Sequence, residues 1–493
     1  MNKYNWTVVY PEAWLLVAAC VVILADVFSR DAERRLTFWL TQISVAFFTL
    51  LHLTAFNAGT TAYGLSGMVV TDPMGHLLAG FAGIAVMLAV GYARPTLGAR
   101  EMLKGEFFTL SLFVLMGISV MTSANHFLVV YLGLELMSLS LYAMVALRRD
   151  HAVATEAAMK YFVLGALASG FLLYGLSMMY GATGSLEIPR VFESIATGRI
   201  NREVLSFGVV FVVAGLAFKL GAVPFHMWVP DVYQGAPTAV TLMIGGAPKL
   251  AAFAITIRLL VEGMLGLAID WQQMFVVLAV GSLVIGNLAA IAQSNLKRML
   301  AYSTISQMGF VLLGLSAGVV SGNTLSAPNA YSSAMFYMVT YVLTTLGTFG
   351  MIMFLSRQGF EAEDIEDFAG LNSRSPWAAG VMSIFLFSLA GVPPMVGFYA
   401  KLAVLQALVT TNVTGYIVLA VVAVLMSLVG AFYYLRVIKV MYFDAPRSPE
   451  PVQRGAGVSA LLAANGLAVL LFGVLPGGLM ALCRDAIVRA LAS

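Results

Sequence analysis

The sequence contains few charged residues. Only 10% of its 493 residues are Asp, Glu, Lys or Arg, against roughly 25% in typical soluble domains. The net charge of +3 is small and thinly spread, which makes a nucleic acid an unsuitable partner. Hydrophobic residues make up 60% of the chain. Water cannot be the main solvent of such a chain, so we expect its surroundings to be a lipid bilayer.

Cysteine is nearly absent. Cys20 and Cys483 stand at opposite ends of the chain, and neither has a neighbour at the spacing of a metal or redox site. We interpret both as apolar filling residues. The sequence also has no glycine-rich nucleotide loop and no cluster of carboxylates spaced as metal ligands. We therefore expect no cofactor and no metal in this chain.

Long apolar runs are abundant. A helix needs about 20 mostly apolar residues to cross a bilayer, and the pattern recurs along the whole chain. It predicts an all-α polytopic membrane protein with about fourteen transmembrane helices. A break is expected in the twelfth span, and the segment 223–234 after the seventh can re-enter the membrane. The predicted spans are 11–28, 36–57, 75–94, 107–123, 126–147, 156–180, 205–222, 237–261, 273–293, 299–317, 331–355, 377–409, 415–441 and 457–481.

The loops between these spans divide by charge. Loops 58–74, 262–272, 318–330 and 410–414 contain no Lys or Arg. Basic residues of the other side are Arg30, Arg34, Arg35, Arg94, Arg100, Lys104, Arg148, Arg149, Lys297, Arg298, Arg357, Arg374, Arg436, Lys439, Arg447 and Arg454. The positive-inside rule places this second set in the cytoplasm and both termini on the outer side of the membrane. Loop 181–204 mixes Arg and Glu, so we expect a surface amphipathic segment there.

Two pairs of short motifs indicate an internal repeat. Ala157-Ala-Met-Lys-Tyr-Phe-Val opens the sixth span and Ser333-Ala-Met-Phe-Tyr-Met-Val the eleventh. Gly221-Ala-Val-Pro-Phe ends the seventh span, and Gly391-Val-Pro-Pro interrupts the twelfth. Because both pairs are separated by an odd number of spans, the copies would run in opposite directions. The pattern predicts two inverted five-helix repeats with discontinuous helices 7 and 12, as found in transporters.

The repeat divides the chain into four parts. Three N-terminal helices occupy 1–106, the first repeat 107–262 and the second, inverted repeat 271–441. A single C-terminal helix is expected over 457–493.

Most ionisable residues are interpreted as lying at span ends, where they can reach water. Five are singled out as exceptions: Glu135, Lys160, Lys219, Lys249 and Lys401. A charge in the middle of a membrane helix costs about 2.5–3.5 kcal/mol unless it pairs or meets water. Moving a carboxylate toward or away from a buried lysine switches that lysine between holding and releasing a proton. A proton path is the functional interpretation. Two alternatives remain open: Lys160 can extend to the interface, and Glu135 can form a purely structural ion pair with one lysine.

Glycines and prolines accompany these lysines. Gly221, Pro224 and Pro248 lie beside Lys219 and Lys249, and the Gly391–Gly397 stretch precedes Lys401 in the same way. A broken helix frees backbone groups that water can satisfy inside a membrane, so hydrated points beside the lysines would suit proton transfer. Kinks that only shape the packing are the alternative.

His226 is the one histidine of five that stands beside these breaks. A neutral imidazole there could relay protons toward Lys249. A structural histidine held by hydrogen bonds is the alternative. The other four histidines lie near span ends.

Four stretches identify a family resemblance. They are Leu132-Gly-Leu-Glu-Leu-Met-Ser-Leu-Ser-Leu-Tyr, Phe218-Lys-Leu-Gly-Ala-Val-Pro-Phe-His-Met-Trp-Val-Pro-Asp-Val-Tyr-Gln-Gly-Ala-Pro-Thr, Lys297-Arg-Met-Leu-Ala-Tyr-Ser-Thr-Ile-Ser-Gln-Met-Gly and Gly391-Val-Pro-Pro-Met-Val-Gly-Phe. These resemble the signature stretches of the antiporter-like subunits of proton-pumping NADH:quinone oxidoreductase (respiratory complex I). The large subunits of multisubunit sodium/proton antiporters share them. The match covers about 110–440.

Within this family the chain is most similar to subunit N. The L subunit carries a long lateral helix after its last spans, and this chain ends soon after its fourteenth. The M subunit has a glutamate where this sequence has Lys401. The resemblance makes Glu135 the key carboxylate, Lys219 its partner, Lys249 the central relay and Lys401 the exit-side lysine. Lys160 and Lys297 match further lysines of the family.

The resemblance implies a subunit that moves protons without holding a redox centre. NADH, FMN, iron–sulfur clusters and quinone would be bound by partner subunits, and a second antiporter-like subunit would be among the membrane neighbours. A subunit of a sodium/proton antiporter is the rival interpretation. A scaffold whose buried charges only join subunits belongs to a different class, which mutants with normal assembly and lost pumping would reject.

Overall fold

The computed structural model describes residues 5–100, 102–198, 200–356, 360–447, 452 and 455–492. Arg357 and Arg454, two of the basic residues that predict the topology, and Arg199 of the mixed-charge loop 181–204 lie outside these residues. The described chain is almost entirely helical. Its strands are β1 (Ala62–Gly64) and β2 (Val69–Thr71), which pair antiparallel in the loop between the second and third spans. This hairpin is a small addition to the predicted all-α fold.

The long helices are α1 (Tyr10–Phe28), α2 (Arg35–Ala58), α3 (Pro73–Ala99), α4 (Gly105–Thr122), α5 (Phe127–Val145), α6 (Ala152–Thr183), α8 (Arg202–Leu220), α12 (Ala268–Ile291), α13 (Leu296–Ser316), α14 (Ala327–Leu355), α18 (Thr414–Phe443) and α19 (Ala456–Val474). The shorter α-helices are α7 (Ile188–Ala196), α9 (Trp228–Gly235), α10 (Thr238–Gly245), α11 (Ala247–Thr256), α15 (Leu371–Arg374), α16 (Pro376–Ala390), α17 (Val396–Val409) and α20 (Pro476–Ala492). The other helices are η1 (Trp6–Val9), η2 (Leu65–Gly67), η3 (Ile257–Gly263), η4 (Leu265–Leu267) and η5 (Ile365–Phe368).

The number of membrane spans agrees with the prediction. Within the described residues, 13 helical segments are long and apolar enough to cross a bilayer. Helices α10, α11 and η3 together form one of them, Thr238–Gly263. The remaining predicted span is the pair of shorter apolar helices α16 and α17, which the break at 391–395 separates.

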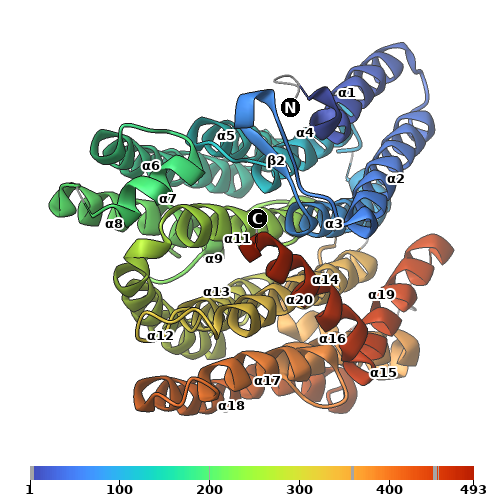
Figure 1. The fold of residues 1–493 in the computed structure, drawn as a ribbon. Helices are drawn as coiled ribbons and strands as arrows, with labels where there is room; N and C mark the ends of the chain where they lie inside the picture. Colours follow the sequence, from blue (N-terminus) through green and yellow to red (C-terminus); the bar gives the residue numbers. More distant parts are fainter. Residues whose placement is uncertain are drawn as a thin grey trace.

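The helices lie roughly parallel to one another, with α6 and α8 at one end of the molecule and α16 to α18 at the other (Figure 1). Helix α13 lies at the centre of the molecule: 94% of its most apolar 18-residue stretch is buried, whereas the corresponding share for α18 is 17%. Figure 1 also shows α20 crossing the surface beside α14. The polar chemistry of α13 is therefore enclosed by protein, whereas the apolar face of α18 is left for lipid or a neighbouring subunit.

The predicted discontinuities are present. Helix α8 ends at Leu220, and Gly221 takes a positive φ of 81°. Helix α16 ends at Ala390, and Gly391 takes a positive φ of 85°. Glycine adopts this left-handed conformation without the penalty that a Cβ brings. Gly246, between α10 and α11, forms a further break inside the eighth span that the sequence analysis did not predict.

Two loop regions differ in their outcome. The mixed-charge loop contains α7, which buries Ile188 and Val191 and exposes Arg190 and Glu193, so the predicted surface amphipathic segment is confirmed. The single C-terminal helix over 457–493 is wrong, because the structure has α19 and α20 there. Leu475 leaves the helical region, and Pro476 begins the next helix, since proline has no N–H to continue the hydrogen bonds of α19.

Candidate proton path

Glu135 and Lys219 face the same side of α5. Lys219 Nζ, near the end of α8, donates to Ser138 Oγ at 2.8 Å. Ser138 follows Glu135 by three residues, so the two side chains share a helix face. Glu135 Oε1 is buried and has no hydrogen-bond partner. The structure therefore brings the lysine beside the predicted carboxylate, with Ser138 rather than Glu135 as its direct partner.

Lys249, in α11, closes the broken end of α8. Its buried Nζ donates to the carbonyl oxygens of Leu220 at 2.8 Å and Lys219 at 3.2 Å. The last carbonyls of a helix have no partner within it, and they form the negative end of its dipole. The Nζ atom also lies 5.6 Å from the ring centre of Trp228. The ammonium group is thus stabilised by neutral oxygens and an aromatic face.

Lys401, in α17, repeats this arrangement at the other break. Its Nζ donates to the carbonyl oxygens of Ala390 at 2.9 Å and Leu389 at 3.1 Å, and to Ser427 Oγ at 2.8 Å. The ring centre of Phe310 is 5.3 Å away. Each lysine therefore acts as a C-terminal cap for the first half of a broken helix.

A polar network of α13 and α14 continues from Lys401. Gln307 Nε2 donates to the Leu389 carbonyl at 3.0 Å, the same oxygen that Lys401 contacts, and to Tyr434 Oη at 3.1 Å. The Tyr337 hydroxyl donates to Gln307 Oε1. These side chains were not predicted, because uncharged hydroxyl and amide groups are common in membrane helices and carry no distinctive spacing.

His226 lies in the segment that joins α8 to α9 and is half-buried. Its Nδ1 atom is buried and has no hydrogen-bond partner. Lys249 Nζ donates to backbone carbonyls instead of to this imidazole. The structure does not bring His226 and Lys249 into contact, so the relay between them stays a prediction.

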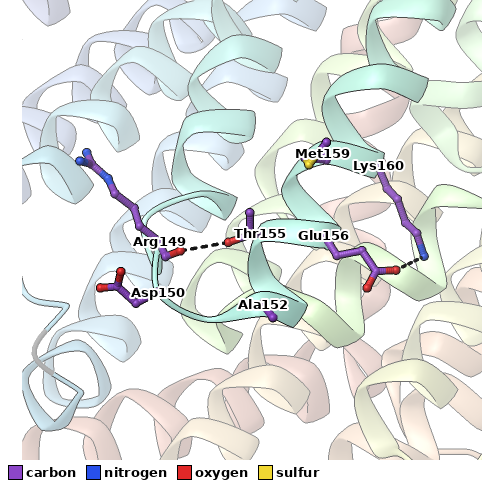
Figure 2. A pocket seen from close by; sticks show the side chains of 7 residues that line it. All are labelled: Arg149, Asp150, Ala152, Thr155, Glu156, Met159 and Lys160. Atoms are coloured by element: carbon purple, nitrogen blue, oxygen red, sulfur yellow. Dashed lines mark hydrogen bonds and ion pairs between the residues drawn. The ribbon is translucent and has the colours of Figure 1, made fainter.

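Lys160 lies at the surface. Its side chain is 43% exposed, and its Nζ is 2.8 Å from both Glu156 Oε1 and Asp231 Oδ2. Figure 2 shows Glu156 and Lys160 pointing toward one another at the edge of a shallow pocket that Arg149 and Thr155 also line. This exposure agrees with the interfacial alternative for Lys160.

Lys297, at the start of α13, is only 1% exposed. Its Nζ lies 2.7 Å from Glu363 Oε1 and donates to the Ala236 carbonyl at 2.9 Å. Asp231 accepts from Arg298 Nη1 at 2.8 Å and also pairs with Lys160. Lys160 and Lys297 therefore belong to two ion-pair clusters that are joined in the chain by the neighbouring residues Lys297 and Arg298. Among the ion pairs of the described residues, neither cluster includes Lys219, Lys249 or Lys401.

One buried charge cluster was missed by the sequence analysis. Arg258 makes two parallel hydrogen bonds to Asp72, at 2.7 and 2.8 Å, and a further one to Glu262 at 2.8 Å. Arg258 falls inside the eighth predicted span, which was the available signal. Asp72 was not distinctive, because an aspartate before a proline is the ordinary start of a helix.

Comparisons with known proteins agree with the resemblance. Residues 124–427 match the family described as NADH:quinone oxidoreductase/Mrp antiporter, TM. NADH-quinone oxidoreductase subunit N of Polaromonas naphthalenivorans is 63% identical over 490 residues, which are 99% of this chain and 98% of the relative. A chain of respiratory complex I from Thermus thermophilus has a TM-score of 0.79 at 30% identity, with 96% of this chain and 98% of that chain covered.

The antiporter likeness is one of fold. A chain of the Mrp complex from a Dietzia species has a TM-score of 0.84 at 20% identity, with 99% of this chain and 97% of that chain covered. Sequence identity over the full length is far higher with the oxidoreductase subunits. On these grounds the chain belongs to the antiporter-like membrane subunits of NADH:quinone oxidoreductase, and within them to the family of subunit N.

Proposed function

We propose that this chain translocates protons across the bacterial inner membrane as a subunit of NADH:quinone oxidoreductase. It would do so without a cofactor of its own, while partner subunits bind NADH, FMN, iron–sulfur clusters and quinone. The single observation that carries this proposal is the pair of buried lysines, Lys249 and Lys401, each held at the broken end of another helix. A second antiporter-like subunit is expected among its neighbours.

Neutral partners suit these lysines to proton exchange. Both Nζ atoms are held by carbonyl or hydroxyl oxygens. An amine in such a site can release its proton without leaving an unpaired carboxylate behind, which would be costly in a buried site. The broken helices also offer backbone groups to water inside the membrane. Proton transfer at Lys249 and Lys401 therefore requires no ion pair to be broken.

Glu135 and Lys219 supply the switch. Lys219 Nζ is held by Ser138, and Glu135 Oε1 is free to accept. A small movement of Lys219 toward Glu135 would replace a hydroxyl partner with a carboxylate and favour the charged amine. The Lys219 carbonyl contacts Lys249 Nζ at 3.2 Å, so such a movement would reach the central lysine through the backbone of α8. Lys160, His226 and Lys297 complete the proposed path.

The proposed arrangement has two inverted units, 107–262 and 271–441, each with a broken helix capped by a lysine. The similar caps on α8 and α16 support this division. Both termini would face the periplasm. The energy for pumping would arrive through contacts with neighbouring subunits.

Purification of the tagged chain from membranes tests the identity of the complex. We expect it to recover hydrophobic partner subunits and an arm that oxidises NADH. Recovery with small antiporter subunits alone would favour the rival, a multisubunit sodium/proton antiporter. Vesicles that hold the assembled complex should take up protons when NADH is added, and vesicles with the complex but no uptake would exclude the pumping role.

A further inference from the structure

The loop between α14 and η5 joins parts of the chain that are distant in sequence. Glu361 Oε1 lies 2.7 Å from Arg100 Nη1 and 3.3 Å from Arg148 Nη1. Arg100 follows the C-terminal end of α3, and Arg148 follows that of α5. Two residues on, Glu363 Oε1 lies 2.7 Å from Lys297 Nζ at the start of α13. All of these residues fall on the side that the basic loops assign to the cytoplasm. The loop therefore places two carboxylates, Glu361 and Glu363, on the cytoplasmic side of the buried Lys297.

Arg100 has unused hydrogen-bonding capacity in this cluster. Its side chain is 10% exposed, and while Nη1 contacts Glu361, Nη2 is buried without a partner. A buried guanidinium normally has its N–H groups satisfied by protein or by ordered water. Its unpaired donor indicates a place for water next to the two carboxylates.

We propose that Glu363 is a proton-loading group: it takes protons from cytoplasmic water and delivers them to Lys297. This inference rests on the proposed pumping function and adds a site to it. In the transfer, Lys297 first gives its ammonium proton inward and becomes a neutral amine. The protonated Glu363 carboxyl then donates its proton to that amine, and the resulting carboxylate takes a new proton from water. Arg100 and Arg148 hold Glu361 in place, so Glu361 is a positioning residue.

Exposure assigns the two roles. Lys297 is 1% exposed and cannot reach bulk water, whereas Glu363 is 24% exposed and touches both water and the lysine. The surroundings also shift the pKa values of the two carboxyl groups in opposite directions. Burial and the adjacent Glu361 raise the pKa of Glu363 above its ordinary value, against the opposing charge of Lys297. Burial acts on Glu361 as well, but Glu363, Arg100, Lys297 and Arg148 together lower its pKa. Such a divergence separates a proton-carrying acid from a fixed anion.

A way inward continues from Lys297. Its second partner is the Ala236 carbonyl. Two residues close to Ala236 in the sequence, Tyr233 and Thr238, have hydroxyls that are buried without partners. The Tyr233 hydroxyl faces Gly245, where an added Cβ would lie 3.2 Å from it. Gly245 stands just before the break that leads to Lys249. Unsatisfied buried hydroxyls are sites for water, so protons delivered to Lys297 can continue toward the central lysine.

The test uses inverted membrane vesicles, in which the cytoplasmic face meets the medium. NADH-driven proton uptake is measured from pH 6 to pH 8.5 and normalised to assembled complex. The charged groups that face Glu363 are Lys297, Glu361, Arg100 and Asp367. These groups, and Arg148, which pairs with Glu361, all remain in the variant Glu363→Gln. We expect this variant to lose about tenfold in uptake at the alkaline end, where water supplies few protons, and clearly less at pH 6.

Two variants accompany it. Glu363→Asp keeps a carboxyl group on a shorter side chain and should restore most of the uptake, with the remaining deficit confined to alkaline pH. Glu366→Gln removes a carboxylate from the same loop region, but one that is 64% exposed and paired with Arg447 on the surface, and it should behave as the unmodified chain.

The outcomes separate cleanly. A wild-type pH profile in Glu363→Gln, or a loss that is equal at every pH, would overturn the loading role. If Glu363→Gln does not assemble, the pH profile of Glu363→Asp decides: a deficit confined to alkaline pH supports the proposal, and a deficit independent of pH overturns it. The proposed function fails separately, if the unmodified complex itself shows no NADH-driven uptake.

Discussion

Lys249 Nζ and the Leu220 carbonyl oxygen lie 2.8 Å apart, so the cation of α11 closes the broken end of α8. A cap of this kind needs only a positive charge. A proton relay needs, in addition, a group that can lose its proton. The two demands can be told apart by substitution.

Arginine at position 249 makes this distinction. It keeps the charge and can donate to the same carbonyls, but it does not deprotonate in proteins. We expect Lys249→Arg to lower NADH-driven proton uptake by about tenfold or more, almost as much as Lys249→Ala. Lys401→Arg should cause a graded, smaller loss, since an exit site can pass protons through water. Full activity of assembled Lys249→Arg would remove the central-relay assignment.

Substitutions at Glu135 and Ser138 separate the two groups that act on Lys219: the carboxylate of Glu135 and the hydroxyl of Ser138 that holds the lysine. Glu135→Gln keeps the shape of the side chain and removes the charge that Lys219 would meet, so we expect normal assembly with strongly reduced quinone reduction and proton uptake. Ser138→Ala removes only the 2.8 Å hydrogen bond to Lys219 Nζ, a contact of about 1.5–3 kcal/mol, and leaves the carboxylate in place. Its loss should be the smaller one. Equal activities of the two variants would contradict a switch based on Glu135.

Gly391 combines a backbone requirement with contact to a proposed site residue. Its φ is 85°, and an added Cβ would lie 2.8 Å from Lys401 Cδ and 3.2 Å from its Nζ. Gly391→Ala should cost about 1–2 kcal/mol in backbone energy and displace the lysine cap, so proton uptake should fall. Gly380→Ala is the matched control, because nothing lies within 4 Å of its added Cβ in the same helix. Uptake is measured in both variants at equal amounts of complex, and an unaffected Gly391→Ala would show that the cap position is not critical.

The sequence predicted those features that a bilayer imposes locally. Apolar runs predicted the spans, and Gly221 and Gly391 predicted the breaks, because only glycine adopts those φ values freely. The sequence could not predict which residues pair when they are distant in the chain. Lys297 and Glu363 are 66 residues apart, and Arg258 and Asp72 are 186 residues apart. No local pattern connects such partners. The same limit applies to the direction of a side chain, since nothing in the spacing of Lys249 indicated that it caps α8.

The basic loops predict the orientation of the chain in the membrane. Reporter fusions after residue 265, in η4, and after residue 412, between α17 and α18, should report the periplasmic face. A fusion after Arg447 should report the cytoplasm. Cytoplasmic signals at both 265 and 412 would be incompatible with the fourteen-span topology.

The cluster of Arg258, Asp72 and Glu262 predicts an unequal response to removing its members. Arg258 is the only cation that the hydrogen bonds and ion pairs of the described residues give to both carboxylates. Arg258→Met would leave two acids without a counter-ion in a buried site, at a cost of about 3–5 kcal/mol. Asp72→Asn leaves Arg258 paired with Glu262, so its cost should be smaller.

Thermal inactivation of the purified complex measures this difference. We expect the order of stability to be wild type, then Asp72→Asn, then Arg258→Met. Arg190→Met is the control, because Arg190 pairs with Glu187 on the exposed surface of α7, and surface pairs contribute about 0–1 kcal/mol. If Asp72→Asn is as unstable as Arg258→Met, Glu262 does not compensate the arginine. The cluster would then depend on the two parallel hydrogen bonds between Arg258 and Asp72 alone.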